Sequence, residues 1–118
     1  MAALKDIARE VADEIRDGIA WVIVYRVGRS WHSLSIYSDI WNEDWEKDDL
    51  TNAWEILNLD PNAIALNGHY CGHFGDNMPI EQISASIRWH YKNGYNQLSS
   101  YEKLQQIGAS GEGNPNDS

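Results

Sequence analysis

The stretch WVIVYRVGRSWHSLSI at residues 21–36 decides the fold, because it predicts two β-strands joined by a tight turn. β-Branched and aromatic residues dominate its first half, and such residues favour strands. Gly28 and Arg29 follow, and glycine in the first of two loop positions is typical of a type II′ hairpin. This turn sets the register and predicts three facing pairs: Tyr25 with His32, Ile23 with Leu34, and Trp21 with Ile36.

The predicted register sorts the side chains of the hairpin onto two faces. One face is largely apolar: Trp21, Ile23, Tyr25, His32, Leu34 and Ile36. The other face is mixed: Val22, Val24, Arg26, Trp31, Ser33 and Ser35. We expect helices to cover one face only. The apolar residues of the second face, Val22, Val24 and Trp31, then need cover, and one hypothesis is a homodimer or regulatory module that associates through them.

Helices and a third strand are predicted around the hairpin. Apolar residues at helical spacing predict a helix over residues 2–17, whose opposite face is acidic: Asp6, Glu10, Asp13, Glu14 and Asp17. The elements expected after the hairpin are a helix capped by Asp48 or Asp49 and ending near Asn58, a strand over 63–67, a helix from about Pro79 to Asn93, and a last helix ending near Ile107.

The order α-β-β-α-β-α-α predicts an α+β fold, with a small three-stranded antiparallel sheet and helices packed on one face. We expect residues 1–107 to form a single globular domain. Residues 108–118 are mostly Gly, Ser, Asn, Asp and Pro, which predicts a disordered tail.

Composition narrows the classes of function. The chain has 118 residues, a formal net charge of −9 and one cysteine, which fits one acidic domain without an internal disulfide. The acidic excess argues against direct binding to nucleic acid or anionic membranes, since both require clustered Lys and Arg. No apolar run approaches a transmembrane length, and the N-terminus has no signal-peptide pattern. We therefore expect a cytoplasmic protein.

Most of the negative charge lies in residues 39–60, which carry eight acids and one lysine and so account for −7. Three tryptophans stand among these acids, which is unlike an acidic low-complexity tail. One interpretation is a solvated face whose tryptophans cover the core. The other is a surface that binds a basic partner: Asp39, Trp41, Glu43, Asp44, Trp45, Glu46, Asp48 and Asp49.

A second candidate site is the stretch NGHYCGH at residues 67–73. His69, Cys71 and His73 occupy alternate positions, so in an extended segment their side chains point the same way. Such a set predicts either a metal site or a Cys–His catalytic pair of Cys71 and His73. A glycine-rich turn with a buried thiol is the alternative interpretation. No phosphate-binding glycine loop or other cofactor motif is present, and we expect no cofactor.

Residues 63–72 and 87–95 resemble small accessory proteins of bacterial mobile elements, a group that includes anti-CRISPR and antirestriction proteins. The resemblance implies an acidic inhibitor that occupies the nucleic-acid channel of a defence nuclease, and it assigns no role to any residue. The second stretch also mixes basic and aromatic groups, such as Arg88 and Tyr95, that could stack nucleobases. We favour a non-enzymatic protein-binding module, with a Cys/His enzyme or metal protein as the alternative.

Overall fold

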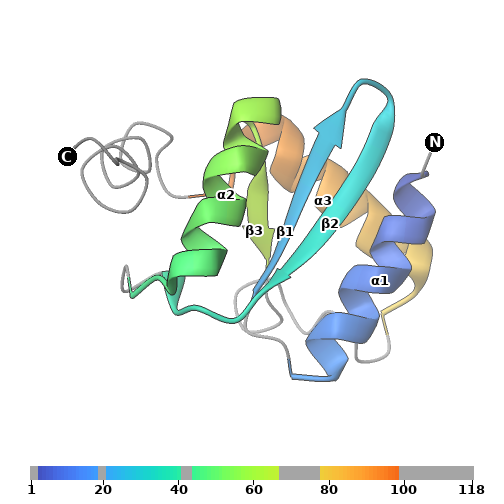
Figure 1. Cartoon of the computed structure of the whole chain (residues 1–118). Coiled ribbons are helices and arrows are strands. Elements are labelled where there is room, and N and C mark those ends of the chain that lie inside the picture. Colours follow the sequence, from blue (N-terminus) through green and yellow to red (C-terminus); the bar gives the residue numbers. More distant parts are fainter. Residues whose placement is uncertain (1–2, 19–20, 41–43, 67–77, 99–118) are drawn as a thin grey trace, which may run out of the picture.

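The computed structural model describes residues 3–18, 21–40, 44–66 and 78–98. Within them, three helices and three strands follow one another along the chain (Figure 1): α1 (Leu4–Arg16), β1 (Trp21–Val27), β2 (Ser30–Ile36), α2 (Lys47–Leu59), β3 (Ile64–Leu66) and α3 (Ile80–Asn93). This order confirms the predicted α+β class. The helix expected to end near Ile107 and the tail from residue 108 lie outside the described residues.

The sheet is antiparallel, with the strand order β2-β1-β3. Tyr25 faces His32 and the other two predicted pairs also occur, which confirms the register inferred from the turn. Gly28 has a φ of 64°, whereas Arg29 is not among the residues with positive φ. Positive φ at the first loop position alone is the signature of the type II′ turn.

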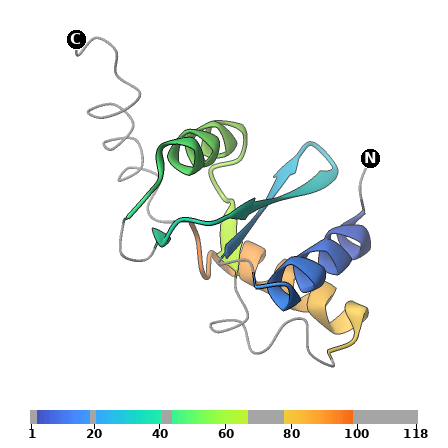
Figure 2. The same ribbon diagram turned by 60° about the horizontal axis from the view of Figure 1, so that its bottom comes forward.

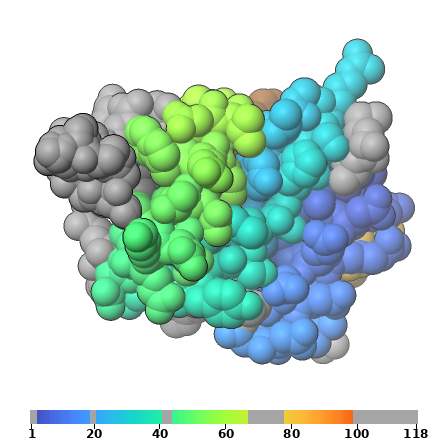
Figure 3. All heavy atoms as spheres, in the orientation of Figure 1, coloured from blue at the N-terminus to red at the C-terminus, as the bar shows by residue number. Residues whose placement is uncertain are grey.

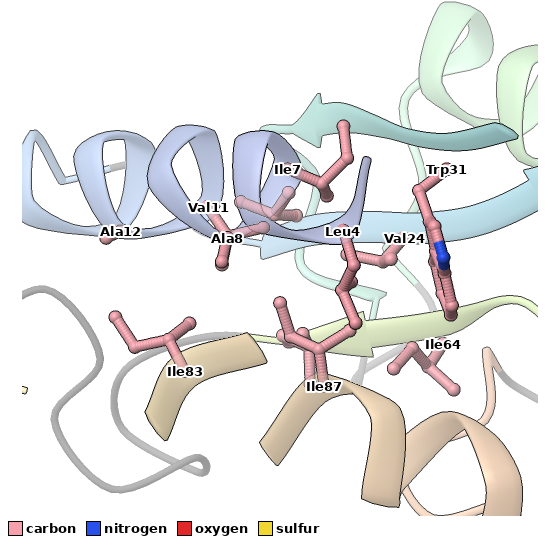
Figure 4. Packing of buried hydrophobic residues seen from close by; sticks show 12 residues of the cluster. Leu4, Ile7, Ala8, Val11, Ala12, Val24, Trp31, Ile64, Ile83 and Ile87 are labelled. Carbon is pink, nitrogen blue, oxygen red and sulfur yellow. The ribbon is translucent and has the colours of Figure 1, made fainter. Parts of the chain in front are cut away.

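Helices cover both faces of the sheet, so the prediction of a single helical layer is wrong. Figure 2 shows α2 on one side of the sheet, with α1 and α3 on the other. Val22, Val24 and Trp31 pack against α1 and α3, as part of a cluster whose side chains meet in Figure 4. The second face is itself apolar enough to require cover, and the helices of the same chain supply it. The three side chains expected to form a dimer face are therefore buried within the chain and do not form an exposed surface.

The largely apolar face packs against α2. Its core includes Trp21, Ile23 and Ile36 from the hairpin, with Leu50 and Leu57 from the helix. Two hydrophobic layers therefore enclose the sheet, one on each face.

The two edges of the sheet differ. Beyond β3, the chain after α3 adds a short pairing: the Ala65 N–H donates to the Asn96 carbonyl, and the Leu98 N–H donates to the Ala63 carbonyl. Gly94 ends α3 in the left-handed conformation (φ 67°), as the Asn93–Gly94 pair predicts, and turns the chain toward this edge. Beyond β2, no described strand is paired.

Candidate protein-binding surface

Exposed carboxylates gather between the end of β2 and the first turn of α2. We call these side chains the acidic end: Asp39, Asp44, Glu46 and Asp48. The Asp44 N–H donates to the Asp39 carbonyl at 3.1 Å, and this bridge brings the two ends of the connecting loop together. Trp41 and Glu43, also predicted for this surface, lie outside the described residues. The structure thus places four of the predicted acids on one end of the molecule.

Asp49 is not part of that surface, which corrects the sequence prediction. The residue is buried, with 8% of its area exposed. Its Oδ2 accepts hydrogen bonds from the Tyr37 N–H (3.1 Å), the Ser38 N–H (3.0 Å) and the Ser38 hydroxyl (2.8 Å). These three donors satisfy the hydrogen-bonding capacity that the buried carboxylate would otherwise lose with its water. Asp49 therefore lies beneath the acidic end, where its hydrogen bonds hold the chain at Tyr37 and Ser38.

The start of α2 also differs from the prediction of an Asp48 or Asp49 cap. The helix begins at Lys47 with Glu46 as its N-cap, and no side chain caps it in the usual way. Instead, the Glu46 N–H donates to the hydroxyl of buried Ser38 at 2.8 Å. Ser38 thus links the acidic end to Asp49. No local sequence pattern indicates this role, because Ser38 lies eight residues before Glu46.

The described tryptophans of this segment pack partly against the hydrophobic core. Trp45 and Trp54 are half-buried and pack against the core cluster between α2 and the sheet. Trp45 keeps some exposed area next to Asp44 and Glu46, which is where an interface anchor is expected. The structure therefore confirms that these tryptophans help to cover the core, while their role in binding a partner stays a prediction.

Asp60 is the last acid of residues 39–60 and lies at the opposite end of α2. It too is buried (5% exposed). Its Oδ2 accepts the Arg26 N–H at 2.8 Å and the Tyr91 hydroxyl at 2.9 Å, while Oδ1 accepts the Asn62 N–H at 3.0 Å. Burial, together with the hydrogen bond to Asp60 and its negative charge, raises the pKa of Tyr91 to about 12, against a smaller opposing effect of Arg26. This contact ties the hairpin, the end of α2 and α3 together.

Three rings form an exposed cluster near the end of α3: Trp89, His90 and Tyr95. The ring centroids lie 5.3–5.7 Å apart, with Trp89 and Tyr95 each more than half exposed. The rings contact one another edge to face or tilted, so they do not present the parallel platform that stacks successive bases. Tyr91, on the same helix, faces the core and touches Trp31.

The His69, Cys71 and His73 set lies outside the described residues, so the metal and Cys–His hypotheses stay predictions. In the part of the chain that the structure describes, no three His, Cys, Asp or Glu side chains are grouped to hold a metal ion. The described helices include none long and apolar enough to cross a membrane.

The chain belongs to the family described as large polyvalent-protein-associated domain 15, whose pattern matches residues 2–101. Domains of this family occur in bacterial polyvalent proteins associated with mobile elements, which agrees with the mobile-element part of the resemblance only. Neither the curated proteins nor the solved structures contain a significant match.

Proposed function

We propose that this domain is a non-enzymatic protein-binding module whose acidic end docks on a basic surface of another protein. The observation that carries the proposal is the exposure of Asp44, Glu46 and Asp48 at the start of α2, next to the buried hydrogen bonds that join Ser38 to Asp49 and to Glu46. Carboxylates accept paired hydrogen bonds from guanidinium groups, and a partly exposed Trp45 beside them supplies an apolar anchor.

The anchored flanks of this loop support the proposal energetically. Ordering the residues of a binding surface costs free energy, and residues that hydrogen bonds already hold in place reduce that cost. Asp49 holds Tyr37 and Ser38 on one side, while the Asp39–Asp44 bridge closes the other. The exposed charges also accelerate encounter with a basic partner, and salt screens this effect.

The partner class we propose is the nucleic-acid channel of a defence nuclease. Such a channel is lined by Lys and Arg that bind phosphates, and clustered carboxylates can occupy the same groups. The domain would inhibit the nuclease by competing with DNA or RNA. The association of the family with large polyvalent proteins supports a mobile-element setting.

The test is charge reversal at the acidic end. The triple variant Asp44→Lys, Glu46→Lys and Asp48→Lys is compared with the wild type against a panel of purified CRISPR effector nucleases, by biolayer interferometry at low and high salt. We expect salt-sensitive binding that displaces nucleic acid and falls at least tenfold in the variant.

A matched control carries the same charge change elsewhere: Asp17→Lys, Glu55→Lys and Glu81→Lys, all at exposed positions. This control should retain most of the affinity. Equal binding by the wild type and the acidic-end variant would contradict the proposal, because the surface would then not contribute to the interface.

A further inference from the structure

The outer edge of β2 has unpaired backbone groups. In a two-residue hairpin the strand residues that flank the turn form a hydrogen-bonded pair, here Val27 and Ser30, and the pattern alternates along the strands. The backbone N–H and C=O groups of Trp31, Ser33 and Ser35 therefore point away from β1. The Arg26 N–H bonds to Asp60 beside β3, as this alternation requires. No backbone hydrogen bond to another described residue satisfies the outward groups of these three residues.

A groove of about 580 Å³ follows this edge, lined by Glu10, Glu14, Ser33, Leu34, Ser35 and Tyr37. Ser33 and Ser35 belong to the face that packs on α1, whereas Leu34 belongs to the opposite face, beside α2. A hollow lined from both faces of one strand must pass along the edge of that strand. Figure 3 shows the β2 and α1 segments side by side on one face of the molecule.

Helix α1 runs along β2 in matching steps. The Ser33 hydroxyl donates to Glu10 Oε1 at 2.8 Å, and the Ser35 hydroxyl donates to Glu14 Oε1 at 2.6 Å. Four helical residues advance about 6 Å, and two strand residues advance about 6.8 Å. A strand added beyond β2 would therefore bring residues two positions apart close to the two glutamates in turn.

Glu10 and Glu14 are the acids of α1 that its arginines leave unpaired. Each arginine pairs with an aspartate about one turn before it: Arg9 with Asp6 at 3.6 Å, and Arg16 with Asp13 at 2.9 Å. Glu10 and Glu14 form no ion pair with a described residue and hold only the serine hydroxyls. The groove is thus negative along one wall and apolar at Leu34.

We propose that the β2 edge binds an extended peptide segment as an added strand, with Lys or Arg at two positions separated by one apolar residue. The peptide backbone pairs with Trp31, Ser33 and Ser35, its basic side chains meet Glu10 and Glu14, and the apolar side chain between them lies toward Leu34. A second copy of this chain fits the edge poorly, because it would set four glutamates against one another. This peptide site is separate from the acidic end and does not depend on the function proposed above.

The probe is a synthetic peptide of sequence TVKVKVT with an N-terminal fluorescein and an amidated C-terminus. Fluorescence anisotropy measures its binding to the full chain, and ¹⁵N–¹H spectra locate it. We expect saturable binding and shifts of the Trp31, Ser33 and Ser35 amides. The matched peptide TVVKKVT has the same composition but adjacent lysines, which point to opposite faces of a strand, and should bind at least fivefold more weakly.

Two protein variants and one modified peptide test the geometry. Ser33→Pro removes an outward N–H while keeping the ladder to β1, and should weaken binding at least tenfold. Glu10→Lys with Glu14→Lys should do the same, whereas the control pair Glu55→Lys and Glu81→Lys should stay within twofold. N-methylation of alternate peptide amides on the pairing side should abolish binding without altering the protein, which keeps the test decisive even if the proline variant is unstable.

Three outcomes would overturn the proposal: equal affinity for the two peptides, no shift at the edge amides, or β2 amide shifts that appear on self-association without peptide. The acidic-end triple variant separates the two proposals, since it should bind TVKVKVT as the wild type does. If only that variant loses the peptide, the edge is not the site, while the function proposed for the acidic end is unaffected.

Discussion

The two ends of α2 use the same residue type in opposite ways. At its N-terminal end, Asp44 and Asp48 are exposed. The next residue, Asp49, is buried and accepts hydrogen bonds from the N–H groups of Tyr37 and Ser38. At its C-terminal end the single acid, Asp60, is buried and collects donors from β1 and α3. The difference teaches that the net charge of a segment does not measure the charge of a surface.

The largest expected loss of stability comes from removing the buried carboxylate at the N-terminal end of α2. Asp49→Ala leaves two N–H groups and the Ser38 hydroxyl without their acceptor in a buried setting. We expect a loss of about 3 kcal/mol in the free energy of unfolding, because unmade buried hydrogen bonds to a charged group are costly. Urea denaturation measures it. Asp48→Ala is the control and should change stability by less than about 0.5 kcal/mol; equal losses for the two variants would contradict the assignment of Asp49.

A smaller effect is expected at the other end of α2. Tyr91→Phe removes the hydroxyl that donates to Asp60 but keeps the ring against Trp31. Asp60 keeps its Arg26 and Asn62 donors, so we expect a loss of about 1.5 kcal/mol. The same denaturation curves check this value. A loss as large as that of Asp49→Ala would show that the two buried carboxylates are not differently supported.

The pH dependence of stability sharpens the comparison, since only the Asp60 end has a donor that titrates. The pKa of Tyr91 is raised from 10.0 to about 12 in the folded chain. The corresponding stabilisation is complete below pH 10 and is lost as the pH rises from 10 to about 12, because the unfolded chain releases the proton first. The wild type should therefore be more stable than Tyr91→Phe at pH 9, and the difference between their unfolding free energies should shrink at pH 11.5. Parallel curves would contradict the hydrogen bond.

The smallest effect is expected from neutralising the acidic end. Asp44→Asn with Glu46→Gln and Asp48→Asn removes charges that are exposed, and we expect stability to change by less than about 1 kcal/mol. Thermal melting at two salt concentrations checks this. A large loss would mean that these carboxylates hold the loop in place, and would weaken the interpretation of them as a surface free to bind.

Much of the fold follows from local pattern. Gly28 specifies a turn whose geometry sets the whole hairpin register, and Gly94 ends α3 because it adopts a left-handed conformation at little cost. The helices were predictable from apolar spacing, because burial repeats with the helical period. The boundaries differ from the predictions by one or two residues, since helix and strand ends depend on neighbours.

The candidate site was less predictable. Asp48 and Asp49 are adjacent and chemically identical, and only the fold determines that one is exposed and the other meets Ser38. The pairing of Ser33 with Glu10 joins residues 23 positions apart, which no local pattern records. The coverage of the second sheet face was missed because its apolar residues were interpreted as a surface for another chain.

The sequence by itself determined the hairpin, its register, the order of the elements and the concentration of negative charge in residues 39–60. These properties depend on turn geometry, periodicity and composition, which act within short stretches of chain. Tertiary structure alone decided which carboxylates are buried, that helices cover both sheet faces, and that β2 keeps an open edge among the described strands. Those outcomes depend on which distant segments supply hydrogen-bond donors and apolar cover, and packing decides them.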